Sequence, residues 1–206
     1  MDKKMKITVH SEPFHYITVE NLWTEKERKE MFDEILLFES KGLFVSPENS
    51  LSAEDDGGTT LKKNKAEFFD NIWLNREYSH VLTHNQKIAA VFQDDAIKNS
   101  WYFKDLWFDM YTTLVSYYEN ADYYKSHRDQ ALVTALTYFF KEPKKFEGGE
   151  IIFTDYDLRF QVTNDVTILF PSNIRHEVSE LSLDKKYEGK GLGRFCMNQF
   201  LKTNFE

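Results

Sequence analysis

The stretch "YYKSHRDQ" (123–130) places a histidine and an aspartate one residue apart, at His127 and Asp129. On an extended strand, residues two apart point to the same face, so this imidazole and this carboxylate would converge while Arg128 points away. Such a pair suits a divalent metal ion, but two ligands are too few to hold it. Alone the pair is weak evidence, because histidine and aspartate are also common in polar turns.

A third ligand should come from another strand. Of the six histidines, His176 alone joins His127 in the strand-rich part of the chain, where a strand resumes after the turn at 171–173. The set His127, Asp129 and His176 provides two imidazoles and one carboxylate, which is the ligand set that leaves open positions on Fe(II) in non-haem iron oxygenases. The only cysteine is Cys196, and this argues against a thiolate-rich structural zinc site.

The elements that would position these ligands are short strands. Segments rich in β-branched and aromatic residues follow one another, separated mostly by turn residues such as Gly, Asn and Pro. Short strands at this spacing predict an all-β sandwich or barrel. The segments are "LWFDMYTTLVSYY" (106–118), "ALVTALTYFF" (131–140), "EIIFTD" (150–155), "LRFQV" (158–162), "DVTILFP" (165–171), "RHEVSEL" (175–181) and "GRFCMNQFL" (193–201).

The first half of the chain shows a different pattern. The alternation over 14–23 predicts a strand. Apolar residues at helical spacing predict a helix over 24–39, and Thr24 and Glu27 have the spacing of a capping box at its start. Two or three short helices are expected within 66–100. These helices should form a layer packed on an antiparallel β core.

We therefore expect a single domain over 1–206, with a helix-rich part at 1–104 and an antiparallel β core with the metal site at 105–206. The segment 45–65 is polar and contains two adjacent glycines, so it predicts a long exposed loop that serves as a lid or is disordered. The fold class is α+β, mainly β.

Composition limits the classes of partner. The net charge is −8 without an evident basic patch, so we do not expect nucleic acid as a partner. No apolar run is long enough for a membrane span, and the N-terminal stretch does not have the pattern of a signal peptide. A single cysteine excludes an internal disulfide and fits a cytoplasmic location. We expect a monomer or a homodimer.

The stretch "YYENADYYKSHRD" (117–129) resembles the Y-x-x-G-x-x-Y-x-x-H-x-D segment of the prolyl 4-hydroxylase-like Fe(II)/2-oxoglutarate-dependent dioxygenases. Further blocks match this family in the same order. They are "ALVTALTYFFKEPKKFEGGEIIF" (131–153), "NDVTILFPSNIRHEV" (164–178) and "GLGRFCMNQFL" (191–201). The resemblance covers roughly 105–201 and implies a double-stranded β-helix, a jelly roll of the cupin kind.

The resemblance implies that His127, Asp129 and His176 bind Fe(II) and are the catalytic centre. It also implies that 2-oxoglutarate chelates the iron and that its far carboxylate binds a cation deep in the barrel. Lys186 and Arg194 are the two candidates. We favour Arg194, because it begins an alternating strand and offers a planar fork for a carboxylate. Compared with the family's usual spacing, that choice requires an insertion of about eight residues between His176 and Arg194.

The resemblance also implies co-substrate contacts for Tyr118, Tyr138 and Tyr124, although each tyrosine would serve equally as an ordinary strand aromatic. The glycine of the family motif is replaced here by Ala121. If that position needs a positive φ, Asn120 is expected to supply it in a shifted turn.

The implied reaction uses Fe(II), 2-oxoglutarate and O2 to hydroxylate a C–H bond, with succinate and CO2 as co-products and ascorbate as a possible additional requirement. The carboxylate at Asp129 favours hydroxylation over halogenation. A peptidyl residue, proline first, is the expected substrate. The alternatives are a free amino acid or small metabolite, and a non-catalytic jelly-roll binding module.

Overall fold

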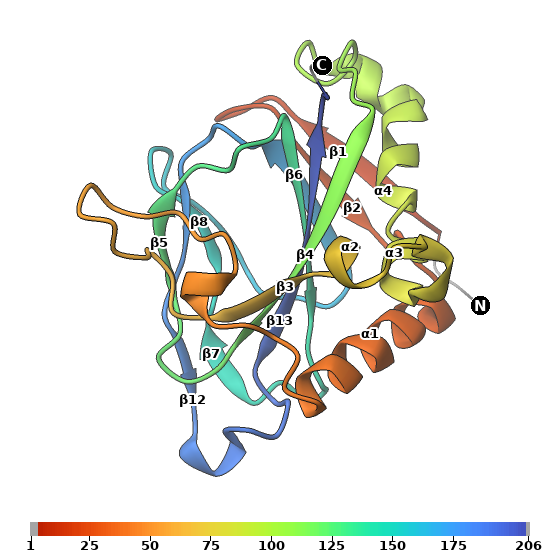
Figure 1. Cartoon of the computed structure of the whole chain (residues 1–206). Helices are drawn as coiled ribbons and strands as arrows, with labels where there is room; N and C mark the ends of the chain where they lie inside the picture. The colour runs from red at the N-terminus through yellow and green to blue at the C-terminus, as the bar shows by residue number, and fades with distance from the viewer. Residues whose placement is uncertain (1–3, 205–206) are drawn as a thin grey trace.

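The computed structural model describes residues 4–204. A seven-stranded antiparallel sheet forms one wall of the molecule (Figure 1). Its order is β1 (Lys6–His10), β2 (Tyr16–Glu20), β10 (Val166–Pro171), β6 (Val133–Phe139), β13 (Arg194–Lys202), β4 (Met110–Tyr118) and β3 (Lys65–Phe68).

A second, four-stranded sheet faces the first and carries the two histidines. Its order is β5 (Tyr124–His127), β11 (His176–Val178), β8 (Ile151–Phe153) and β9 (Leu158–Phe160). A separate pair joins β12 (Leu181–Leu183) to β7 (Phe146–Gly148). The predicted fold class is therefore confirmed: the chain is mainly β, and two antiparallel sheets face each other across one of its two hydrophobic clusters.

The strands of the first half are the main difference from the sequence-based expectation. The strand predicted at 14–23 is β2, but β1 and β3 were not predicted. β1 and β2 pair beside β10, and β3 pairs with β4 at the other edge. The helix-rich part thus supplies both edges of the large sheet.

The predicted helix over 24–39 is α1 (Glu25–Ser40), and its capping box is present. The Thr24 hydroxyl accepts from the Glu27 N–H at 3.2 Å, and the Glu27 carboxylate accepts from the Thr24 N–H at 2.9 Å. The short helices are α2 (Phe69–Ile72), α3 (His80–His84) and α4 (Lys87–Ala90), with 3-10 turns at Pro47–Asn49, Arg76–Tyr78, Val91–Gln93, Asp95–Asn99 and Lys185–Tyr187. None of the helices within 4–204 has the length and apolar character needed to span a bilayer.

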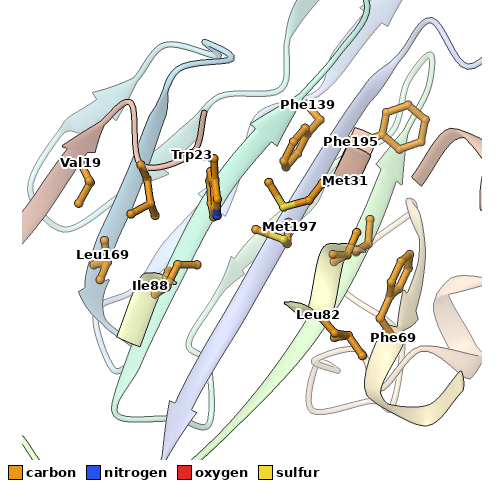
Figure 2. Packing of buried hydrophobic residues seen from close by; sticks show 14 of the residues in the cluster. Val19, Trp23, Met31, Phe69, Leu82, Ile88, Phe139, Leu169, Phe195 and Met197 are labelled. Atoms are coloured by element: carbon orange, nitrogen blue, oxygen red, sulfur yellow. The ribbon is translucent and has the colours of Figure 1, made fainter. Parts of the chain in front are cut away.

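The alternation of β13 divides the core into two parts. Phe195 and Met197 point toward the helical layer and pack with Met31 of α1 and Phe139 of β6, as Figure 2 shows. Arg194, Cys196 and Asn198 alternate with them and line a cavity between the two sheets. One strand therefore anchors the helical layer on one face and builds the cavity on the other.

The turn before β5 differs from the expectation. Ala121 itself has the positive φ of 61°, whereas Asn120 accepts a hydrogen bond from the Leu183 N–H through its side chain at 3.1 Å. The prediction that Asn120 would take the positive φ is wrong, because its amide is used to tie the turn to β12.

This conformation predicts the effect of restoring the motif glycine. An alanine in the left-handed region destabilises the folded state by roughly 1 kcal/mol relative to glycine. Glycine offsets part of this gain, because its greater freedom stabilises the unfolded chain. We expect Ala121→Gly to raise the free energy of unfolding by about 0.5–1 kcal/mol in urea denaturation. Ala89→Gly, within the helix α4, is the matched control and should lower the free energy of unfolding by about as much. Equal losses in both variants would contradict the strain at Ala121.

Candidate active site

Pairing between β5 and β11 brings the first two predicted metal ligands together. His127 lies directly opposite His176 in the antiparallel register, and their ring centroids are 4.4 Å apart. Asp129 follows β5 by two residues. Its Oδ1 lies 3.6 Å from His127 Nε2, and its Oδ2 lies 3.5 Å from His176 Nε2. One ligand atom from each of the three residues lies within 4.8 Å of the others, so the three atoms can share one ion.

Backbone carbonyls fix the orientation of both imidazoles. His127 Nδ1 lies 2.8 Å from the Lys125 carbonyl oxygen, and His176 Nδ1 lies 2.9 Å from that of Ile174. Because a carbonyl only accepts, each Nδ1 must carry the proton, which leaves each Nε2 lone pair directed at Asp129. Metal-binding histidines are oriented in this way. Burial also lowers the pKa of His176, which favours the neutral form that binds metal.

Asp129 is also held in position by Thr134 and Ser172. The Thr134 hydroxyl of β6 donates to its Oδ2 at 2.6 Å, and the Asp129 N–H donates to the Ser172 carbonyl at 2.9 Å. Burial alone would raise the pKa of Asp129, but the two adjacent imidazoles and the hydrogen bond from Thr134 together bring it below its ordinary value. The side chain is therefore an anion poised to bind a cation.

The three ligands open onto a cavity of about 370 Å³. Arg194 lies in the wall and is fully buried. Its NH1 donates to the Gly149 carbonyl, while Nε and NH2 have no hydrogen-bond partner among the described residues. A buried guanidinium with free donors is costly unless an anion pairs with it. The cavity thus combines three possible metal ligands with an unsatisfied cation that suits a carboxylate.

Gly149 makes the position of Arg194 possible. A Cβ at Gly149 would lie 3.3 Å from Arg194 Cδ, and its φ is 72°. Lys186, the rival candidate, lies outside the cavity in the turn after β12. Its ammonium pairs with Asp184 at 2.6 Å, and its side chain is 62% exposed. Of the two cations, only Arg194 faces the cavity.

The three predicted tyrosines occupy different places. Tyr118 lines the cavity, with the Arg194 guanidinium 3.9 Å from its ring centroid. Tyr124 also lines the cavity, and its ring stacks on the His127 ring with the two centroids 3.6 Å apart. Tyr138 lies behind Arg194, at 5.1 Å from the guanidinium, and its hydroxyl accepts from the Ile151 N–H at 3.1 Å. Their contacts with a co-substrate remain predictions.

The loop over 45–65 runs beside β5 (Figure 1), and its residues Leu51, Ser52, Ala53 and Lys62 line the cavity. Movement of this loop as a lid stays a prediction. Arg128 is exposed, unlike the buried His127, and belongs to the residues that border the cavity.

Two residues that lie at the site were not singled out by the sequence analysis. Thr134 fixes Asp129, and the inward position of this threonine in the predicted strand 131–140 was a usable signal. Lys62 lies among Lys63 and Lys65, and nothing in the sequence sets it apart from them.

A second group of possible metal ligands lies on the helical layer. Glu30 of α1 and His80 and His84 of α3 also offer atoms within 4.8 Å of one another. Here His84 Nε2 already bonds Glu30 at 3.0 Å, and Lys26 lies 3.7 Å from the same carboxylate. This group ties α3 to α1 and lines neither the cavity beside His127 nor the smaller pocket beside Trp23.

No family model matches the sequence, and no curated protein matches it significantly. Solved structures do match. A Pseudomonas putida prolyl-4-hydroxylase has 14% identity and a TM-score of 0.61, with 92% of each chain covered. A viral collagen prolyl hydroxylase from Paramecium bursaria Chlorella virus-1, in a 2OG complex, has 14% identity and a TM-score of 0.59, with 92% of this chain and 96% of that chain covered.

NgTET1 in complex with 5mC DNA is also similar, with 13% identity, a TM-score of 0.52, and 92% of this chain and 72% of that chain covered. The comparisons therefore do not support the expectation that nucleic acid is excluded as a partner. At these identities the likeness concerns the fold. The resemblance indicated by the sequence blocks is confirmed at that level: the chain has the double-stranded β-helix fold of prolyl 4-hydroxylase-like Fe(II)/2-oxoglutarate oxygenases.

Proposed function

We propose that the protein is an Fe(II)- and 2-oxoglutarate-dependent dioxygenase that hydroxylates a C–H bond. One observation carries this proposal: the group formed by His127, Asp129 and His176 opens onto the same cavity as the buried, incompletely bonded guanidinium of Arg194. Two imidazoles and one carboxylate suit Fe(II) and leave positions for other ligands. A guanidinium suits the far carboxylate of a dicarboxylic co-substrate.

Each group of this chain has a defined task in that reaction. The three ligands hold the metal on one face, and their carbonyl and hydroxyl partners keep them oriented before it binds. When bound, Fe(II), 2-oxoglutarate and O2 supply the oxidising chemistry, which yields succinate and CO2. Arg194 binds the co-substrate, supported by the ring of Tyr118. Apolar wall residues such as Leu136 and Ile151 exclude water from the cavity.

A peptidyl residue, with proline first, is the proposed substrate. It is supported by the similarity to two prolyl hydroxylases. A free amino acid or small metabolite is the second candidate, and it is supported by the cationic character of the cavity wall. We further propose a cytoplasmic enzyme, supported by its single cysteine, that acts as a monomer or homodimer. Support of turnover by ascorbate is proposed from the family resemblance.

Turnover tests the reaction class. With Fe(II), ascorbate and O2, we expect the protein to convert 2-oxoglutarate to succinate and to add 16 Da to members of a pool of peptides and amino acids, as measured by mass spectrometry. His127→Ala should lower succinate release by more than about 100-fold, because it removes a metal ligand. Unchanged succinate release in His127→Ala would contradict the metal-centre assignment.

Metal binding tests the site without turnover. We expect His176→Ala to weaken the binding of Co(II), a spectroscopic substitute for Fe(II), by about 100-fold or more under anaerobic titration. His80→Ala is the matched control, since it removes a histidine from the surface group on α3. If His80→Ala abolishes the Co(II) spectrum and His176→Ala does not, the metal binds at the group of Glu30, His80 and His84 instead.

Co-substrate affinity tests the choice of anchor. Loss of a buried charged partner costs about 2–5 kcal/mol, so Arg194→Met should raise the Kd of 2-oxoglutarate by more than about 30-fold. Lys186→Met should leave that Kd unchanged, because its ammonium pairs with Asp184 outside the cavity. Isothermal titration of the Co(II)-loaded protein measures both values. The reverse pattern would assign the anchor to Lys186.

A further inference from the structure

Lys62 is a buried cation in the wall of the cavity. Its side chain is almost completely shielded from solvent, with a relative exposure of 4%. The backbone around it is fixed, because Lys62 forms a β-bridge with Tyr124 and the Tyr124 hydroxyl accepts from the Ala53 N–H at 2.9 Å. The ammonium lies 5.7 Å from the Tyr124 ring centroid. Lys62 therefore stands beside the ring that stacks on His127.

This ammonium has weak compensation within the protein. Its one hydrogen bond among the described residues goes to the Ser50 carbonyl at 3.3 Å, and it forms no ion pair within that part of the chain. Burial lowers the pKa of Lys62 to about 8, so the group still carries its charge at neutral pH. A buried charge with one long hydrogen bond is costly unless an anion approaches it.

The other charges of the cavity wall do not supply that anion. The lining contains four Lys or Arg residues and one carboxylate, Asp129. In the proposed function Asp129 faces the metal, and the two carboxylates of 2-oxoglutarate go to the metal and to Arg194. Lys62, Arg128 and Lys202 then remain without a negative partner in the cavity, and of these three Lys62 is the buried one.

We propose that the substrate carries a carboxylate that pairs with Lys62 when the substrate lies against Tyr124. This inference rests on the proposed function and specifies its substrate class: an acidic peptide or a free amino or carboxylic acid, which share the same recognised group.

Matched pairs of acids and amides test the inference. The pool contains free proline and prolinamide, other amino acids with their amides, and short proline peptides in which each Glu or Asp member has a Gln or Asn twin. We expect the acid member of a pair to be hydroxylated with a kcat/KM at least about tenfold higher than its amide. Free acids and acidic peptides are scored separately, so the result also identifies the source of the carboxylate.

Lys62→Met should remove this preference. We expect it to raise the KM of the acid by about tenfold or more, while the KM of the amide and the Kd of 2-oxoglutarate change less than about twofold. Lys63→Met is the matched control: Lys63 is exposed, its ammonium bonds the Ala121 carbonyl at 3.3 Å, and the acid preference should persist. Saturation-transfer NMR with the same pool measures acid-selective binding independently of turnover.

The two proposals fail in different ways. Acid-selective binding that depends on Lys62, without succinate release, would overturn the proposed reaction but keep the carboxylate site. Succinate release without preference for acids in either assay would overturn the inference about Lys62 alone. A rise in the Kd of 2-oxoglutarate in Lys62→Met would also overturn it, because Lys62 would then be part of the co-substrate site.

Discussion

The antiparallel register that places His127 opposite His176 is the constraint on which the site depends. Successive side chains of a strand point to opposite faces, so a slip of one residue between β5 and β11 would turn one histidine away from the cavity. The register is supported on the other side of β11, where Glu177 and Val178 pair with β8. Asp129 reaches the two histidines through a short extension of the chain beyond β5. The hydrogen bond from its N–H to the Ser172 carbonyl fixes that extension.

Buried charge is the second organising feature. Asp129, Arg194 and Lys62 lie between apolar layers where an unpaired charge is expensive. Each has partners that hold its position while leaving some of its bonding capacity free: Thr134 for Asp129, the Gly149 carbonyl for Arg194, and the Ser50 carbonyl for Lys62. The fold is thus preorganised for a cation beside Asp129 and for anions beside the two bases, at a cost in stability that the helical layer and the large sheet must offset.

Much of this arrangement is predictable from the sequence, for physical reasons that differ between elements. Helix α1 is predictable because a capping box and an apolar stripe coincide, and β13 because its residues alternate over a long run. The proximity of His127 and Asp129 is predictable because the two residues lie at strand spacing. Short edge strands such as β1 and β3 carry little periodicity and depend on tertiary pairing. Lys62 is not predictable at all, since the burial that distinguishes it from Lys63 comes from the path of a loop.

A crystal structure grown anaerobically with Fe(II) and 2-oxoglutarate tests this arrangement most directly. We expect the metal bound by His127 Nε2, Asp129 and His176 Nε2, and the far carboxylate of 2-oxoglutarate on the Nε and NH2 donors of Arg194 that lack partners in the described chain. Iron bound at Glu30, His80 and His84 instead, or a 2-oxoglutarate carboxylate that leaves those Arg194 donors unpaired, would contradict it.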